Sequence, residues 1–234
     1  MSGTLYGVGV GPGDPELLTL KAARLIETAR VVAYPAPKGG TSFAREIAAA
    51  FVPEGAEEIE IAIPMDVARY PAQDVYDDAA ATLANRLAAG RDVVVLCEGD
   101  PFFYGSFMYL FARLSGRFEV EVVPGVTSVS ASAAAALHPL SARNQVLTIL
   151  PGPLPEAALE ARLQTADAFA IMKVGRHLPK IRVVLDRLGL TDDAWYLERT
   201  TLDAEVILPL RKAPATAPYF SIILVRKGAD PWLS

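Results

Sequence analysis

An uninterrupted apolar run, VVVLC, constrains the fold more than any other feature of the sequence. It lies in the strand expected over Asp92–Cys97 and lacks the polar alternation of a strand with one face in water. Such runs are typical of parallel strands that helices cover on both faces. The run therefore predicts an α/β domain built on a parallel sheet.

Strand-like and helix-like segments alternate along the N-terminal half, and the pattern changes near Gly116. Beyond that point the chain becomes more strand-rich, and its last three strands follow one another without clear helices. We therefore expect an α/β domain over residues 1–116 and a mixed-sheet α+β domain over residues 117–234. The expected strands are Leu5–Gly9, Val31–Tyr34, Glu58–Ile63, Asp92–Cys97, Glu119–Val123, Val146–Leu150, Phe169–Met172, Trp195–Leu197 and two more within EVILPL and YFSIILV; the expected helices open at Asp14 and span Phe43–Phe51, Gln73–Ala89, Ser106–Leu114, Val126–Leu137 and Leu178–Leu188.

The composition narrows the classes of function. The net charge of −5 gives no support to a nucleic-acid or anionic-membrane partner. No apolar run approaches the length of a membrane span, and the opening MSGTLYG lacks the regions of a signal peptide. A single cysteine, Cys97, excludes an intrachain disulfide, so we expect a cytoplasmic protein.

The histidines and the cysteine do not form a metal site by spacing. His138 and His177 are the only histidines, and Cys97 stands alone, so no cluster of zinc ligands is expected. Cys97 ends the apolar run, and a small buried core thiol is the favoured interpretation of it.

The first glycine-rich loop lies in LYGVGVGPGDPELLTLKA, between an expected strand and an expected helix. A dinucleotide fingerprint from Gly7 or Gly9 would need its third glycine where Pro12 or Asp14 stands. The chain also has no Gly-Lys-Ser or Gly-Lys-Thr of a phosphate-binding P-loop. The loop is therefore either a tight strand-to-helix turn or a place where φ is positive or the backbone comes close to something.

Three further loops resemble the first in design. EGDPFFYG (Glu98–Gly105) follows the buried strand at the end where α/β sheets bind ligands. PGVTS (Pro124–Ser128) places two hydroxyls at an expected helix start, and IMKVG (Ile171–Gly175) ends another strand with glycine. Taken singly, these segments are better explained by a turn, a helix cap and core packing than by a ligand site.

The order and spacing of the four loops are more specific. Together, GVGVGPGDPELLTLKA, GDPFFYG, EVVPGVTS and MKVG closely resemble the tetrapyrrole methylase family, and the resemblance runs from Leu5 to about Val225. It implies a two-domain α/β fold with a ligand cleft between the domains, S-adenosylmethionine as methyl donor, and a homodimer. It also implies the donor-site residues: Pro12, Glu98, Gly99, Asp100, Phe103, Thr127, Ser128, Met172, Arg199 and Thr200. Arg199 replaces a small residue that is common in the family.

The loop YPAPKGGTSFA resembles one branch of that family, the precorrin-2 C-20-methyltransferases of cobalamin biosynthesis. The segments PMD and ERTTLDAEVI are similar to the same branch. The resemblance implies methylation of precorrin-2 at C-20 without a protein-bound metal. The alternatives are the same methylation of cobalt-loaded factor II, another tetrapyrrole methylase, and a non-catalytic module of the same fold; the missing fingerprint argues against a dinucleotide oxidoreductase.

The substrate side of the site is expected near the end of the second strand. Tyr34, Lys38, Gly39, Gly40, Thr41 and Ser42 are the substrate-binding candidates, because backbone N–H groups ahead of a helix bind carboxylates. The same residues can equally form a mobile surface loop. Arg69, Arg143 and Lys173 are weaker candidates for the same role. A strong general base is not required, because C-20 is already nucleophilic, and the catalytic residue stays unassigned, with Tyr34 and Asp66 as candidates.

Overall fold

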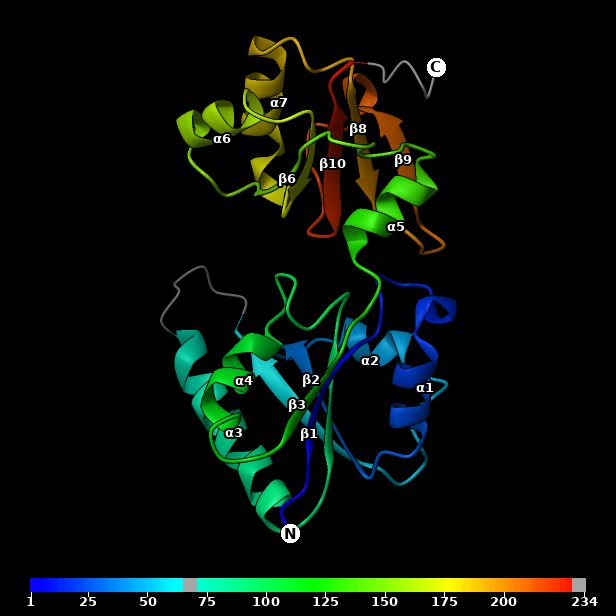
Figure 1. Cartoon of the computed structure of the whole chain (residues 1–234), viewed down its shortest axis with the longest axis vertical. Coiled ribbons are helices and arrows are strands. Elements are labelled where there is room, and N and C mark those ends of the chain that lie inside the picture. The colour runs from blue at the N-terminus through cyan, green and yellow to red at the C-terminus, as the bar shows by residue number, and fades with distance from the viewer. Residues whose placement is uncertain (65–70, 229–234) are drawn as a thin grey trace. The chain divides into compact units, whose positions relative to one another are not determined.

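The computed structural model describes residues 1–64 and 71–228, which form two compact units, Met1–Thr127 and Ser128–Ser234 (Figure 1). The division between the two units falls after Thr127. The reason is that strand β5 (Val120–Val123) pairs in parallel with β1 (Leu5–Gly9) and completes the first sheet. The sequence pattern changes before that strand, whereas the packing changes after it.

The first sheet is parallel throughout, as the apolar run predicts. Its strands lie in the order β3-β2-β4-β1-β5, and every described pairing between neighbours is parallel. The remaining strands are β2 (Val31–Pro37), β3 (Glu57–Ile63) and β4 (Val93–Cys97). All five residues of β4 are buried, because helices cover both faces of the sheet.

Helices cover both faces of this sheet (Figure 1). On one face, α1 (Leu20–Glu27) and α2 (Phe43–Ile47) pack over a core that includes Val8, Ile26 and Leu96. On the other face, α3 (Pro71–Ala88) and α4 (Phe107–Leu114) bury a second core with Leu83, Val95, Cys97 and Leu110. Neighbouring β4 residues alternate between the two cores, as strand geometry requires.

The helix expected to open at Asp14 is interrupted. Asp14 caps a short 3₁₀ turn, η1 (Pro15–Leu17), by accepting a hydrogen bond from the backbone N–H of Glu16. Leu18 then returns to an extended backbone, and Thr19 caps α1 separately. The prediction of one continuous helix was therefore wrong, because two caps stand five residues apart where one was expected.

The second sheet is mixed, as expected. It has the order β6-β7-β10-β8-β9, with β6 and β7 parallel and the other pairs antiparallel. Its strands are β6 (Leu147–Pro151), β7 (Ala168–Met172), β8 (Ala194–Glu198), β9 (Val206–Pro209) and β10 (Ser221–Arg226).

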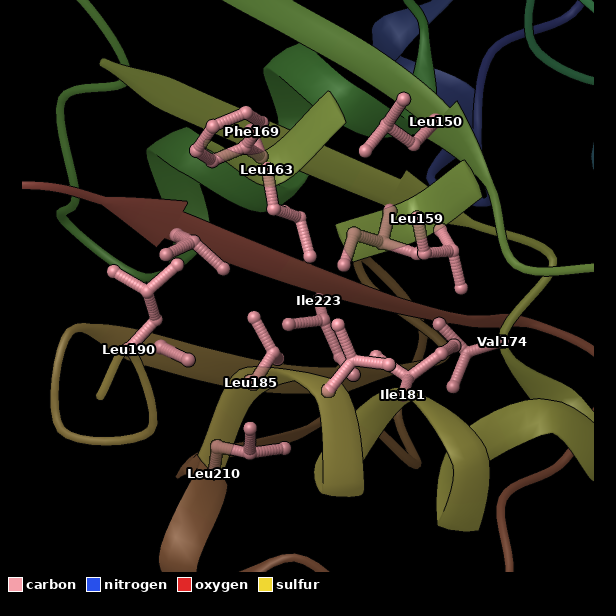
Figure 2. Packing of buried hydrophobic residues seen from close by; sticks show 14 of the residues in the cluster. Leu150, Leu159, Leu163, Phe169, Val174, Ile181, Leu185, Leu190, Leu210 and Ile223 are labelled. Carbon is pink, nitrogen blue, oxygen red and sulfur yellow. The ribbon is translucent and has the colours of Figure 1, made fainter. Parts of the chain in front are cut away.

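Helices α6 (Glu156–Leu163) and α7 (Leu178–Arg187) cover one face of this sheet; the sequence interpretation had missed α6. Figure 2 shows how side chains from both helices surround Ile223 of β10 in one cluster. Helix α5 (Ser128–Ala135) contacts β10, and the 3₁₀ turns η2 (Gly175–His177) and η3 (Leu210–Lys212) complete the unit. None of the helices in the part of the chain that the structure describes is long and apolar enough to cross a membrane.

Candidate functional site

At the carboxyl edge of the first sheet, the loops after β1 and β4 continue to pair beyond the strands. The backbone N–H of Gly99 donates to the carbonyl oxygen of Gly11 at 2.8 Å, and the N–H of Gly11 donates to that of Gly99 at 3.3 Å. Both residues have a positive φ, of +81° at Gly11 and +63° at Gly99. This conformation favours glycine, so it accounts for both residues without a ligand.

A third loop, after β5, packs against these two. A Cβ atom on Gly125 would lie 2.0 Å from the carbonyl oxygen of Gly99, and one on Gly9 would lie 2.6 Å from the same oxygen. No side chain fits at such distances. Of the alternatives that the sequence left open, the glycines at Gly9 and Gly125 therefore serve a close backbone-to-backbone approach.

Asp100 ties the second and third loops together. One carboxylate oxygen accepts a hydrogen bond from the N–H of Phe102 at 2.9 Å, and the other accepts one from the N–H of Gly125 at 3.1 Å. Hydrogen bonds to an ionised group are stronger than neutral ones. Both oxygens are thus engaged in holding the loops.

Glu98 differs from Asp100 although only one residue separates them. Its side chain is half-buried, and burial raises the pKa of its carboxyl group. No residue within 1–64 or 71–228 forms a hydrogen bond or an ion pair with this carboxyl group. A half-buried carboxyl group without a partner, at the ligand-binding edge of a parallel sheet, is characteristic of functional sites.

The neighbouring Cys97 is a core residue, as interpreted from the sequence. Its thiol is buried among the side chains of the α3 and α4 face, and burial raises its pKa well above the usual range. A thiol in this state is a poor nucleophile, because the thiolate is the reactive form.

The aromatic residues after Asp100 differ in exposure: Phe102 and Tyr104 are exposed, and Phe103 is half-buried. Phe102 packs edge-on against Phe111, with ring centroids 5.1 Å apart. Phe103 is half-buried and lies against the exposed ring of Tyr104, at a centroid distance of 5.4 Å. Tyr104 has a φ of +57°, which is uncommon for a residue other than glycine.

Tyr34, a candidate for substrate binding and catalysis, takes part in a surface network. Its hydroxyl hydrogen-bonds to Glu58, and Arg45 binds the same carboxylate through Nε at 2.7 Å and Nη2 at 3.0 Å. Burial and the adjacent Glu58 carboxylate raise the pKa of Tyr34. A phenol whose pKa is raised further stays protonated at neutral pH and has no free basic form to accept a proton, which argues against Tyr34 as a base. The other candidate, Asp66, and Arg69 lie outside the described residues.

The segment Lys38–Thr41 is exposed, whereas the adjacent Ser42 is buried. The Ser42 hydroxyl donates to the carbonyl oxygen of Pro35 at 2.6 Å and accepts from the N–H of Arg45 at 3.3 Å. It therefore fixes the start of α2 instead of facing solvent. Of the substrate-binding candidates in this loop, Lys38, Gly39, Gly40 and Thr41 are the ones that a ligand in solution can reach.

In the second unit, the pairing of the strands brings the carboxyl ends of β6, β7 and β8 to one edge of the sheet. Met172, the last residue of β7, is half-buried at this edge, and its carbonyl oxygen accepts the N–H of Gly152 at 2.7 Å. Arg199 and Thr200 follow β8 directly. The structure thus brings three of the expected donor-site residues to the same edge.

The backbone after β8 is strained. Arg199 has a φ of +48° and Thr201 one of +70°, and a β-branched residue rarely adopts this conformation. Lys173 after β7 has a φ of +56°. Left-handed conformations outside glycine cluster at functional sites, where surrounding contacts hold them in place.

Ser132, Tyr196 and Glu198, which the sequence did not single out, help to hold this edge. The hydroxyls of Ser132 on α5 and Thr200 are both buried and lie 3.0 Å apart. Buried Glu198 accepts a hydrogen bond from the hydroxyl of Tyr196, and Nη1 of Arg199 lies 3.4 Å from its second oxygen. Ser132 and Thr200 are far apart in sequence, so no local pattern announces the pair.

The expected donor-site residues are thus divided between the units. The first unit holds Pro12, Glu98, Gly99, Asp100, Phe103 and Thr127; the second holds Ser128, Met172, Arg199 and Thr200. Pro12, Thr127 and Ser128 are half-buried, and Ser128 is the first residue of α5.

Comparison with known proteins gives a consistent result. The sequence profile of the Tetrapyrrole (Corrin/Porphyrin) Methylases matches residues 4–213. The "Precorrin-2 C(20)-methyltransferase" of Sinorhizobium sp is 45% identical over 97% of this chain and 97% of its own length. The "Cobalt-precorrin-2 C(20)-methyltransferase" of Salmonella typhimurium is 33% identical over 97% of this chain and 98% of its own length.

The chain spans about half the length of the first curated relatives it matches. The "Cobalamin biosynthesis protein CobIJ" of Mycobacterium tuberculosis is 45% identical over 97% of this chain but only 46% of its own length, so the chain spans about half of that relative. Among solved structures, the uroporphyrin-III C-methyl transferase from Thermus thermophilus complexed with S-adenyl homocysteine superposes with a TM-score of 0.68 at 26% identity. That match covers 96% of this chain and 92% of the other.

Proposed function

Because the chain belongs to the tetrapyrrole (corrin/porphyrin) methylases, we propose that it methylates precorrin-2 at C-20 to give precorrin-3A in cobalamin biosynthesis, with S-adenosylmethionine as donor. The observation that carries this proposal is the similarity to a precorrin-2 C(20)-methyltransferase over nearly the full length of both chains. Similarity across both units supports more than a shared fold, because it includes every loop of the candidate site.

We assign the methyl donor to the loops at the two sheet edges. Pro12, Gly99, Phe103 and Thr127 supply backbone groups, an aromatic face and a hydroxyl from the first unit. Met172 and the backbone at Arg199 suit the flanks of an adenosine, because they combine half-buried apolar surface with strand-end polar groups. The remaining donor-site assignments are Asp100, Ser128 and Thr200, and Glu98 lies beside Gly99 at the same edge.

The proposed reaction is an in-line displacement. The donor supplies an electrophilic methyl group on a sulfonium, and C-20 of the reduced tetrapyrrole is an enamine-like carbon. The new carbon–carbon bond forms as the carbon–sulfur bond breaks, and the electron pair of that bond goes to sulfur. Aligning the reacting atoms can lower the barrier by up to ~7–11 kcal/mol. The protein's main task is then to position two ligands and exclude water.

Precorrin-2 carries several carboxylates, which need cations or N–H donors. We assign the exposed residues Lys38, Gly39, Gly40 and Thr41 to this role. Ser42 holds the end of the loop through its hydrogen bonds to Pro35 and Arg45. Tyr34 lies on the strand that leads into this loop. Closure of the loop over the substrate would shield the reaction from water.

Methylation of the cobalt-loaded substrate is the second candidate. It is favoured by the similarity to a cobalt-precorrin-2 C(20)-methyltransferase over nearly the whole of both chains. A cobalt ion held by the tetrapyrrole needs no ligand from the protein, so the reaction at C-20 would be the same.

We further propose that the active form is a cytoplasmic homodimer. The family resemblance supports the dimer, and the lone buried thiol of Cys97 is compatible with a reducing compartment. Sedimentation of the purified protein at several concentrations measures the oligomeric state directly.

The test is an anaerobic incubation with S-adenosylmethionine and enzymatically prepared precorrin-2, followed by mass spectrometry of the pigment. A parallel reaction contains the cobalt chelate. The proposal predicts the gain of one methyl group on the metal-free pigment. Gain on the cobalt chelate alone would select the second candidate, and no gain on either pigment, with the donor shown to bind, would contradict both.

A further inference from the structure

The proposed methylation leaves a chemical requirement that the donor site does not meet. After the methyl group is transferred, the reacting carbon carries both the methyl group and its original hydrogen. The hydrogen must leave as a proton so that the electron pair of its bond returns to the conjugated system. A group with a suitably placed basic atom must accept that proton.

Three half-buried carboxylates lie in the loops after β1 and β4, and two of them are engaged; the fourth acid of these loops, Glu16, is exposed. Asp14 caps η1 through the N–H of Glu16 at 2.8 Å. Asp100 accepts hydrogen bonds from the backbone of two loops. Glu98 is the third, and no hydrogen bond or ion pair in the described part of the chain occupies its carboxyl group.

The position of Glu98 follows from the register of β4. Val94 and Leu96 face the α1 and α2 side of the sheet, whereas Val95 and Cys97 face the α3 and α4 side. Continuing this alternation places Glu98 on the same side as Leu96. Tyr34 of the adjacent strand β2 packs on that side too, and β2 leads into the loop assigned to the substrate.

From this geometry we infer that Glu98 is the catalytic residue that accepts the proton released from C-20. The inference rests on the proposed function. The carboxylate oxygen forms a bond to hydrogen, the carbon–hydrogen electron pair restores the conjugation of the macrocycle, and the neutral carboxylic acid then loses its proton to solvent. No oxidant or further reactant is needed.

The environment of Glu98 suits this role. Burial is the one cause that raises its pKa, which brings the carboxyl group closer to neutral pH and makes it a better proton acceptor than an exposed glutamate. Charged and titratable neighbours do not contribute to that shift. The titratable and charged groups around this end of β4 come from three segments. Cys97 and Asp100 lie beside Glu98 on its own segment, and Asp14 and Glu16 follow β1. Tyr34, Glu58 and Arg45 lie on the α1 and α2 side of the sheet.

The test compares the wild-type protein with Glu98→Gln, Glu98→Asp and Glu98→Ala. Glu27→Gln, at the exposed end of α1, is the matched control for loss of a carboxylate. Binding of S-adenosylhomocysteine is measured by calorimetry, and turnover of precorrin-2 is measured across pH. A second set of reactions uses precorrin-2 with deuterium at C-20.

We expect kcat of Glu98→Gln to fall by about 100-fold or more, the usual contribution of a positioned acid–base group. Its binding of S-adenosylhomocysteine should be unchanged. In the wild-type protein, kcat should rise with pH through a pKa above the ordinary glutamate range. This rise should be absent in Glu98→Gln. The deuterium isotope effect should be larger in Glu98→Gln than in wild type, Glu98→Asp should retain part of the activity, and formate should partly restore Glu98→Ala.

Two results would overturn the assignment while leaving the proposed function intact. The first is wild-type kcat and pH dependence in Glu98→Gln. The second is a loss of activity that runs parallel to a loss of S-adenosylhomocysteine binding, which would make Glu98 a donor ligand. If the wild-type protein methylates neither precorrin-2 nor its cobalt chelate, the proposed function itself fails, and that outcome is read from the wild-type reactions alone.

Discussion

The carboxyl edges of the two sheets are built by different means. At the first edge, glycine backbones from three loops touch one another, and the Asp100 carboxylate binds backbone N–H groups of two of them. At the second edge, side-chain hydrogen bonds hold the loops, through the Ser132–Thr200 pair and the buried Glu198 carboxylate. The backbone there includes residues other than glycine with a positive φ.

The two edges therefore differ in how many amino-acid substitutions they can tolerate. A Cβ atom on Gly9 or Gly125 would lie 2.0–2.6 Å from the carbonyl oxygen of Gly99, which excludes every residue except glycine, so the first edge has little freedom in its sequence. A pair of hydroxyls or a carboxylate with its donors can be exchanged for another pair of similar size. We therefore expect substitutions at the first edge to cost more than those at the second.

The largest effect is expected for Gly125→Ala. The new methyl group would meet the carbonyl oxygen of Gly99 at 2.0 Å, and relief requires the loops to separate. We expect a loss of about 3 kcal/mol in the free energy of unfolding and weaker donor binding. Gly116→Ala, where nothing lies within 4 Å, is the control and should be close to neutral. Urea denaturation measures both; equal stability of the two variants would contradict the packing account.

Asp100→Asn should have the next largest effect. The amide keeps one acceptor oxygen, but its NH₂ group then faces a backbone N–H of Phe102 or Gly125. Losing a charged acceptor should cost about 2 kcal/mol. Asp203→Asn, at an exposed position of the second unit, serves as control in the same thermal unfolding experiment. An Asp100→Asn midpoint as high as that of the control would show that this carboxylate does not hold the loops.

Ser132→Ala tests the second edge and should cost about 1 kcal/mol, because it leaves the buried Thr200 hydroxyl without its partner. The double variant Ser132→Ala, Thr200→Val should lose less stability than the sum of the single variants, since no orphaned hydroxyl remains. A double-mutant cycle by chemical denaturation measures this coupling. Strict additivity would mean that the two hydroxyls do not interact in solution.

The smallest effect concerns the exposed network around Glu58. Arg45 lowers the pKa of Glu58 below its ordinary value, so the carboxylate stabilises the folded state above the ordinary glutamate pKa. This contribution is lost as the pH falls through the lowered folded-state pKa. Because the pair is exposed, Glu58→Gln should cost about 0.5 kcal/mol at neutral pH. Its deficit relative to wild type should shrink in acid; a deficit that grows in acid would reverse the sign of the account.

Most strands could be predicted from the sequence because their signal is local. The run ending in Cys97 specifies a doubly covered parallel strand by itself, and the glycine motifs mark the loops that meet at the first edge. Helix α6 was not predicted for two reasons. Gly152, Pro153 and Pro155 are typical of a loop and stand directly before the helix, and the helix is only two turns long.

The parts of the site that the sequence did not reveal depend on contacts between distant residues. Ser132 and Thr200 meet only after α5 docks on the second sheet. Asp100 accepts backbone hydrogen bonds and Glu98 does not, because only the folded loops bring N–H groups to Asp100. The motif EGD alone does not distinguish the two acids. The division between the units after Thr127 also depends on a long-range contact, the pairing of β5 with β1.

The most direct measurement uses S-adenosylmethionine with a ¹³C-labelled methyl group, the purified protein and precorrin-2 under anaerobic conditions, with NMR of the product. The account predicts one labelled methyl group, bonded to C-20 of the macrocycle. A labelled methyl group on any other carbon, or no label in the pigment while the labelled donor is seen to bind, would contradict it.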